Sequence, residues 1–230
     1  MKAKKCLLVV LCVVVALAIA FLVYVNQYYR ADETALSLVK EGFVHRQGNL
    51  TMLIPEEDTD TGLLFYPGAK VETEAYLPLL NQFREAGYLC VLIEMPFYMA
   101  IFDIDAALDG IEACEDIDHW FLMGHSMGGA MASQFASEHP DILEGLVLLG
   151  AYPYKEFDPT LVVYGSLNTS VAEKLDKTDH VVCLEGGNHA QFGNYGLQKG
   201  DPAGEISRQE QQDKTVEAVL PFLESCLAQS

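Results

Sequence analysis

The pattern Gly-x-Ser-x-Gly at residues 124–128 constrains the fold of this chain more than any other local feature. Residues 120–123 before it are apolar and of strand length, and residues 129–136 after it favour a helix. The chain must therefore turn sharply at Ser126, and the flanking glycines let the backbone bend without side-chain clashes. A helix that begins at Met127 would direct free backbone N–H groups toward an oxygen atom near the serine. We predict a nucleophile elbow with Ser126 at its tip.

Apolar segments of strand length alternate with helical segments along most of the chain. Strands are predicted at residues 43–46, 50–54, 62–66, 88–95, 120–123, 145–149, 161–164 and 180–184, and helices at 74–85, 104–115, 129–136 and within 207–228. This alternation predicts an α/β fold, a three-layer sandwich with a mostly parallel sheet, in which antiparallel pairing is limited to the first strands. Ligands of such sheets bind beyond the carboxyl ends of the strands, so the side chains that follow the strands are the candidate site.

An apolar segment, residues 6–25, precedes the α/β pattern and contains no charged residue. As a helix with a rise of about 1.5 Å per residue it would be about 30 Å long, which is the thickness of the hydrocarbon core of a bilayer. Three lysines precede the segment, and the positive-inside rule then places the N-terminus in the cytoplasm. We predict a cytoplasmic N-terminus (1–5), a transmembrane signal anchor (6–25), a stalk (26–42) and an extracytoplasmic domain (43–230).

A cleaved signal peptide is the alternative for the same segment. Residues 16–18 and 18–20 have the small-x-small pattern that signal peptidases cut, and cleavage there would release a secreted protein. The apolar run continues through residues 21–25, beyond the length of about 7 to 15 residues of a usual signal-peptide core. An uncleaved anchor in the cell membrane is therefore the favoured interpretation.

The charge and the cysteines limit the possible partners. All 33 acidic residues, but only 10 of the 14 basic ones, lie beyond Arg30, and the formal net charge of the chain is -19. Nucleic acid is therefore a poor partner, and so is an anionic lipid surface for the domain. The cysteines lack the C-x-x-C spacing of a zinc site, and no metal is predicted. Cys90 and Cys183 lie in predicted strands, where we expect buried free thiols.

A serine hydroxyl is a weak nucleophile until a base accepts its proton. His189 follows the last predicted strand, where the base of a Ser–acid–His chain order belongs, and the small residues before it let its backbone approach the sheet. Attack on a carbonyl also creates an oxyanion, which needs two N–H donors. We predict that the N–H of Met127, at the helix start, and the N–H of Ala69, after the third strand, are these donors.

With these features the chain resembles the alpha/beta-hydrolase superfamily, and within it the dienelactone hydrolase-like type called alpha/beta hydrolase family 5. The likeness covers residues 43–227 and rests on the elbow and on the motifs Tyr66-Pro67-Gly68-Ala69, Met95-Pro96-Phe97, Tyr164-Gly165-Ser166, Gly187-Asn188-His189 and Phe192-Gly193. The resemblance implies an esterase-like serine hydrolase that acts on small acyl esters or thioesters through an acyl-enzyme, without a cofactor.

One position departs from the superfamily pattern. Asn168 stands where the resemblance implies the aspartate of the triad. Asparagine can orient His189 but cannot stabilise the imidazolium by charge, and such an exchange costs about 10⁴ in rate in a serine triad. Three interpretations stay open: a slow enzyme with Asn168 as the orienting residue, an enzyme with a substitute carboxylate such as Asp158 or Glu185, and an inactive domain that only binds. An acyltransferase or peptidase that uses the same serine also stays open.

Overall fold

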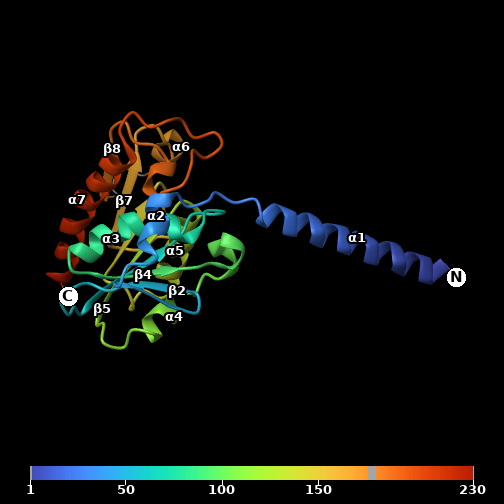
Figure 1. Ribbon diagram of the computed structural model, residues 1–230, viewed down its shortest axis with the longest axis horizontal. Helices are drawn as coiled ribbons and strands as arrows, with labels where there is room; N and C mark the ends of the chain where they lie inside the picture. Colours follow the sequence, from blue (N-terminus) through green and yellow to red (C-terminus); the bar gives the residue numbers. More distant parts are fainter. Residues whose placement is uncertain (1, 176–179, 230) are drawn as a thin grey trace.

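The computed structural model describes residues 2–175 and 180–229 (Figure 1). Its strands are β1 (Val44–Gln47), β2 (Leu50–Leu53), β3 (Thr61–Tyr66), β4 (Leu89–Ile93), β5 (His119–His125), β6 (Gly145–Leu149), β7 (Thr160–Gly165) and β8 (His180–Leu184). Its α-helices are α1 (Lys2–Val25), α2 (Glu33–Leu38), α3 (Leu77–Glu85), α4 (Ala107–Glu112), α5 (Met127–Glu138), α6 (Thr169–Ala172) and α7 (Arg208–Leu227). Short 3-10 turns are η1 (Thr73–Tyr76), η2 (Pro96–Tyr98), η3 (Ala100–Phe102) and η4 (Ala190–Phe192).

The strands form one eight-stranded sheet in the order β1-β2-β4-β3-β5-β6-β7-β8. The pairs β1/β2 and β2/β4 are antiparallel, and all other neighbouring pairs are parallel. This arrangement confirms the predicted fold class and the restriction of antiparallel pairing to the first strands. Strands β3, β4 and β6 are buried along their whole length, which is why they are continuous apolar runs.

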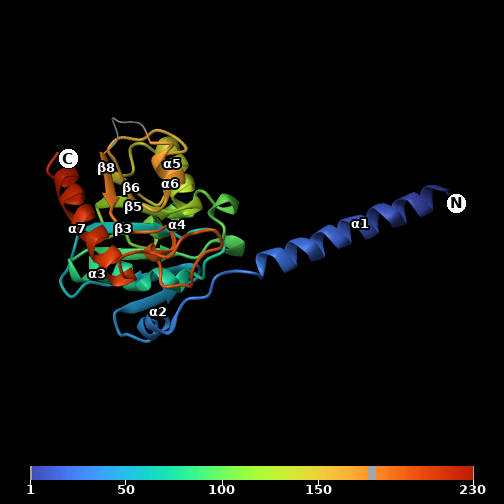
Figure 2. The same ribbon diagram turned by 90° about the horizontal axis from the view of Figure 1, so that it is seen from above.

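Helices cover both faces of the sheet (Figure 2). On one face α2, α3 and α7 contribute Ala35, Leu80 and Val219 to an apolar cluster with the sheet. On the other face α4, α5 and α6 contribute Ala107, Phe135 and Val171 to a second cluster. The sheet is thus the middle layer of three, and the carboxyl ends of its parallel strands meet at a common edge.

Some predicted features differ from the structure in detail; the helix predicted at 104–115, for example, is shorter and covers only Ala107–Glu112 (α4). The helix predicted at 74–85 begins with the 3-10 turn η1, because Pro78 has no N–H to extend the α-helical hydrogen bonds toward the N-terminus. Cys90 is a buried thiol, as expected, but Cys183 is exposed. The prediction for Cys183 was wrong because β8 lies at the edge of the sheet, and periodicity alone does not tell an edge strand from a central one.

The N-terminal helix α1 extends away from the domain (Figure 1). Lys4–Val25 is long and apolar enough to cross a membrane, with a mean hydropathy of 3.4, and apart from Val25 at its end it is exposed; a signal sequence can have the same properties. Residues 26–42, for which the sequence predicts a stalk, lie against the domain. Ala35 is fully buried there, and Asp32 forms an ion pair of 2.7 Å with Arg208 of α7.

Candidate active site

Ser126 connects β5 to α5 in a strained backbone conformation, with φ 54° and ψ -121°. Positive φ is unfavourable for a residue with a Cβ, and it persists here because the neighbouring backbone leaves no alternative. A Cβ on Gly124 would lie 2.6 Å from the carbonyl oxygen of Gly128, and a Cβ on Gly128 would lie 2.2 Å from the carbonyl oxygen of Tyr66. The glycines of the motif are therefore required by close backbone approach, and the turn has the geometry of a nucleophile elbow.

His189 lies opposite this serine, between β8 and η4. Its Nε2 is 3.0 Å from Oγ of Ser126, although the two residues are 63 positions apart. Nε2 is therefore within reach of the proton that the serine must lose. Burial lowers the pKa of His189 below its usual value, while the charge of Asp201 acts in the opposite direction.

Asn168, which follows β7, contacts the other ring nitrogen of His189. Its Nδ2 donates to Nδ1 of His189 at 2.8 Å, and its Oδ1 accepts a hydrogen bond of 2.9 Å from Oγ of Ser170. In this arrangement Nδ1 is an acceptor, so neutral His189 carries its proton on Nε2. That tautomer points a proton at Ser126 and cannot act as its base.

A half-turn of the Asn168 amide would reverse this protonation. Oδ1 would then accept the Nδ1 proton of His189, and the hydroxyl of Ser170 could accept from Nδ2, because a hydroxyl is both donor and acceptor. Nε2 would be free to take the serine proton. Asn168 therefore fits both tautomers of His189, whereas an ionised aspartate would fit only the catalytic one.

The two carboxylates considered as substitutes do not contact His189 in the described part of the chain. Asp158 precedes β7, so it lies toward the amino end of that strand, away from the edge that carries Ser126. Glu185 follows β8 but is exposed. The carboxylate that the structure brings to His189 is Asp201, which accepts hydrogen bonds from the backbone N–H groups of His189 and Ala190.

A buried hydrogen-bonded chain joins the predicted oxyanion loop to the loop of the base. Nε2 of His125 donates to the carbonyl oxygen of His189 at 3.0 Å, which leaves Nδ1 to accept from the hydroxyl of Tyr76 at 2.8 Å. That hydroxyl accepts the N–H of Gly68 at 3.0 Å. Burial and the nearby His189 hold the pKa of His125 well below its usual range, so its ring is neutral. The sequence pattern at Tyr76 indicates only a buried position in a helix, and nothing in it reveals this contact.

The N–H groups of Ala69 and Met127 make no hydrogen bond with any residue of the described ranges. Met127 is the first residue of α5, where the N–H groups have no partner within the helix. Ala69 follows Gly68 in the loop after β3, and the next N–H, of Lys70, is held by the carbonyl oxygen of Tyr98 at 2.7 Å. Both donors thus remain available to an oxyanion, as the sequence predicts for them; this role stays a prediction.

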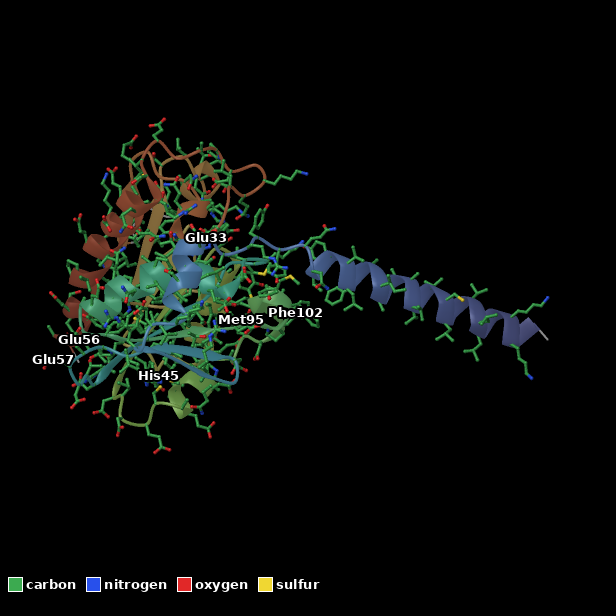
Figure 3. The ribbon with its side chains drawn as sticks, in the orientation of Figure 1. Glu33, His45, Glu56, Glu57, Met95 and Phe102 are labelled. Carbon is green, nitrogen blue, oxygen red and sulfur yellow. The ribbon has the colours of Figure 1, made fainter. Side chains whose placement is uncertain are left out.

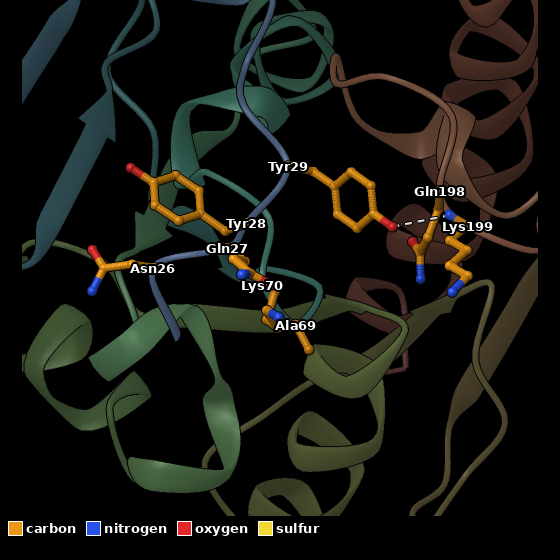
Figure 4. A pocket seen from close by; sticks show the side chains of 8 residues that line it. All are labelled: Asn26, Gln27, Tyr28, Tyr29, Ala69, Lys70, Gln198 and Lys199. Atoms are coloured by element: carbon orange, nitrogen blue, oxygen red, sulfur yellow. Dashed lines mark hydrogen bonds between the residues drawn. The ribbon is translucent and has the colours of Figure 1, made fainter. Parts of the chain in front are cut away.

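A cleft of about 540 Å³ lies beside Ala69 (Figure 4). Its other lining residues are 26–29, Lys70, Gln198 and Lys199. One wall of the cleft therefore comes from the segment that follows α1. The hydroxyl of Tyr29 in this wall accepts a hydrogen bond of 2.9 Å from the backbone N–H of Lys199, on the other side of the cleft. The connection to α1 is part of the surface around the candidate site.

Solved structures of other proteins have the same fold as this chain. An α/β-hydrolase enzyme from a sediment metagenome of the Mar Chica lagoon has the same fold, with a TM-score of 0.55 and 14% identity over 79% of this chain and 98% of its own. MenH from S. aureus gives a TM-score of 0.57 and 12% identity, covering 79% of this chain and all of that one (100%).

Sequence comparison finds a similar protein and a matching family. A protein of Mycobacterium phage D29, whose name refers to a non-heme haloperoxidase, is 28% identical over 129 residues, 51% of this chain, and the chain spans about half (46%) of that protein's length. The family model described as "Alpha/beta hydrolase family" matches residues 62–213, well over half of the chain and including the elbow, Asn168 and His189. The chain therefore belongs to the alpha/beta hydrolase family.

Proposed function

We propose that the protein is a serine hydrolase that cleaves small acyl esters or thioesters through an acyl-enzyme. The observation that carries the proposal is the distance of 3.0 Å between Oγ of Ser126, on a strained elbow, and Nε2 of His189. A positioned base within hydrogen-bond reach of a hydroxyl is the arrangement of an activated nucleophile. The free N–H groups of Ala69 and Met127 support the proposal, because tetrahedral intermediates need such donors.

The mechanism has two balanced steps. In the first, Oγ of Ser126 bonds to the acyl carbon as Nε2 of His189 takes its proton, and that proton passes to the leaving alcohol or thiol when the ester bond breaks. In the second, His189 takes a proton from water, the resulting hydroxide attacks the acyl-enzyme, and the proton returns to Ser126 as the acid leaves. During both steps the Asn168 amide would be turned so that its Oδ1 accepts the Nδ1 proton of His189, which leaves Nε2 free to take the serine proton.

A serine-directed fluorophosphonate tests this mechanism. We expect the native protein to be labelled covalently and Ser126→Ala to show no labelling, because the reagent needs the activated hydroxyl. Ser133→Ala is the matched control: Ser133 is buried on α5 with its hydroxyl bonded to the carbonyl oxygen of Ala130, so labelling should persist. Equal labelling of the native protein and Ser126→Ala would remove Ser126 as the nucleophile.

We further propose that α1 anchors the protein in the cell membrane with the hydrolase domain outside the cytoplasm. The length and hydropathy of Lys4–Val25, and its exposure up to Tyr24, support an anchor. The packing of Ala31 and Ala35 on the domain keeps the connection short, so the domain would stay close to the membrane.

A binding domain without turnover is the second candidate. It is favoured by the hydrogen bond from Nδ2 of Asn168 to Nδ1 of His189, because this bond selects the tautomer that cannot deprotonate Ser126. The two candidates differ in whether any short-chain ester is cleaved in a Ser126-dependent way.

A further inference from the structure

Three large apolar side chains form an exposed surface on the turns that follow β4. Phe97, Ile101 and Phe102 are 46%, 53% and 50% exposed, and the rings of Phe97 and Phe102 meet edge to face at 5.5 Å. We call these three residues the aromatic edge. Clustered exposed apolar side chains mark surfaces that contact a partner or a membrane.

The aromatic edge is continuous with the apolar helix α1. Phe21 of α1 packs edge to face on Phe97 at 5.2 Å and on Phe102 at 6.1 Å. Phe21 lies one turn before the end of α1 at Val25, about 6 Å along the axis, so the aromatic edge is level with the last apolar turn. Figure 3 shows Phe102 on the side of the domain from which α1 leaves.

The backbone fixes this surface to the candidate active site. Phe97 and Tyr98 have φ of 56° and 57°, a region that side chains with a Cβ rarely adopt, and such strain tends to persist where function requires it. The carbonyl oxygen of Tyr98 holds the N–H of Lys70, directly after Ala69. The aromatic edge therefore cannot move far without moving the predicted oxyanion loop.

Two cationic side chains lie close to tyrosine rings at and just beyond the end of α1. Nζ of Lys70 lies 3.7 Å from the ring centre of Tyr24, and the guanidinium of Arg30 lies 4.0 Å from that of Tyr28. Tyrosines with neighbouring Lys or Arg are typical of the membrane–water interface. The domain as a whole is acidic, and Arg30 also forms an ion pair with Glu72 at 3.5 Å.

We propose that the aromatic edge inserts into the lipid bilayer beside α1 and that the substrate is an acyl ester carried in that bilayer. The mouth of the site would then open at the membrane surface, where a lipid-borne ester can reach Ser126 without leaving the interface. This inference rests on the proposed function and names its substrate class. The depth of insertion, level with the last turn of α1, matches that of interfacial apolar side chains.

Fluorescence in vesicles tests insertion. The full chain is reconstituted in phosphatidylcholine vesicles with or without lipid that is brominated on its acyl chains. The native protein contains only the buried Trp120, so the emission of the new tryptophan is the emission of Phe97→Trp minus that of the native protein. We expect brominated lipid to remove about half or more of the added emission, because the ring would lie at the headgroup–acyl boundary. Glu56→Trp, at an exposed position on the far side of the domain in Figure 3, should lose none.

Activity tests the substrate class. The triple variant Phe97→Ser, Ile101→Ser, Phe102→Ser should cleave a vesicle-borne ester about tenfold more slowly, which corresponds to about 1.4 kcal/mol, and a soluble short-chain ester at the native rate. Leu36→Ser is the control, because Leu36 on α2 is about as exposed as the residues of the aromatic edge, and it should change the rate with neither ester. If the triple variant cleaves the vesicle-borne ester at the native rate, or loses the same factor on both esters, the substrate class is overturned. If brominated lipid does not quench the tryptophan of Phe97→Trp, insertion is overturned. Absence of any Ser126-dependent cleavage would instead refute the proposed function, with the quenching result still decisive for insertion.

Asn168 carries no charge, but the carboxylate of Asp201 lies at the backbone of His189. Oδ1 of Asp201 accepts the N–H of His189 at 3.1 Å, and Oδ2 accepts the N–H of Ala190 at 2.8 Å. Both carboxylate oxygens are thus fixed at the backbone of the base. The other polar groups around the ring, from His125, Ser126 and Asn168, carry no charge.

We infer that Asp201 is a positioning residue that supplies, through space, the negative charge of the missing triad aspartate. The charge favours the imidazolium form that arises when His189 takes the proton of Ser126, while Asn168 orients the ring. Neither hydrogen bond of Asp201 involves the ring itself, so Asp201 stabilises the charge of the base without selecting its tautomer.

The rate of Ser126 labelling by the fluorophosphonate, measured as a function of pH, distinguishes the effect of the Asp201 charge from a structural effect of its hydrogen bonds. Asp201→Asn keeps a side chain of the same shape but removes the charge, which should lower the pKa of His189 by about one unit. The acid limb of the labelling profile should then move to lower pH, and the plateau rate of labelling should fall about tenfold. Asp201→Glu keeps the charge but disturbs the hydrogen bonds, and should keep the acid limb near its native position. Asp213→Asn, on α7 with its carboxylate bonded to Gln209, is the control and should change neither quantity.

An NMR titration of the His189 ring gives the same readout without activity. A shift of the His189 pKa in Asp201→Asn but not in Asp201→Glu supports the charge role. A native pKa in Asp201→Asn, even with slower labelling, would reduce Asp201 to a structural support of the loop and overturn the inference. Loss of labelling in Ser126→Ala is tested independently, so a failure here does not touch the proposed nucleophile.

Discussion

Asn168→Asp is expected to raise kcat/KM for short-chain esters by about 10² to 10⁴, the reverse of the loss that follows removal of the aspartate from a serine triad. The reason is the pair of hydrogen bonds around Asn168. Its Nδ2 now donates to Nδ1 of His189, whereas an ionised carboxylate can only accept and would hold the ring proton on Nδ1. Nε2 would then face Ser126 as an acceptor, and Ser170 could still donate to the second carboxylate oxygen.

The pH profile of this variant should move in a direction opposite to that of Asp201→Asn. Burial lowers the pKa of His189 in the native protein, so its neutral form persists to a lower pH than that of a free imidazole. A second nearby carboxylate raises that pKa, and the acid limb of kcat/KM should shift to higher pH as the plateau rises. Asn81→Asp, on α3 where the side-chain oxygen already accepts from Arg84, is the matched control and should change neither value. An unchanged plateau in Asn168→Asp would mean that Asn168 does not limit the reaction. If neither the native protein nor Asn168→Asp cleaves any short-chain ester, the domain that only binds is favoured.

The sequence predicts those parts of the protein that depend on neighbouring residues. The parallel sheet follows from apolar runs such as β4 and β6, which must be buried on both faces, and the elbow follows from glycines spaced around Ser126. His189 could be selected because chain order in an α/β fold fixes which strand end carries the base. In each case the prediction needs only the residues of a short segment and the position of that segment along the chain.

The contacts that connect distant segments could not be predicted in this way. The hydroxyl of Tyr76 meets Nδ1 of His125 across 49 positions, and Asp201 reaches the backbone of His189 from a loop without a periodic pattern. Residues 26–42 carry no strong apolar pattern either, yet Ala35 is fully buried because the surface beneath it, formed by α3, is apolar. Such packing depends on the shape of the assembled fold, which local patterns do not specify.

Gly128→Ala is expected to destabilise the protein and inactivate the site together. The new Cβ would lie 2.2 Å from the carbonyl oxygen of Tyr66 and 2.4 Å from that of Pro67, and backbone atoms cannot rotate away as a side chain can. We expect a loss of about 3 kcal/mol of unfolding free energy, the upper range for overpacking, and a decrease in Tm of about 6 to 12 °C. Thermal unfolding of the detergent-solubilised full chain measures this effect.

The same displacement should move the loop that carries the N–H of Ala69, because Tyr66 and Pro67 lead directly into it. Loss of one oxyanion donor costs about 10² to 10³ in rate, so Ser126 labelling and ester turnover should both fall by that factor even below the Tm of the variant. Gly42→Ala is the matched control: its Cβ meets no atom within 4 Å, and both stability and rate should stay native. A Gly128→Ala protein with native Tm and native turnover would contradict the close contact between the elbow and the loop after β3, and with it the assignment of Ala69 to the oxyanion.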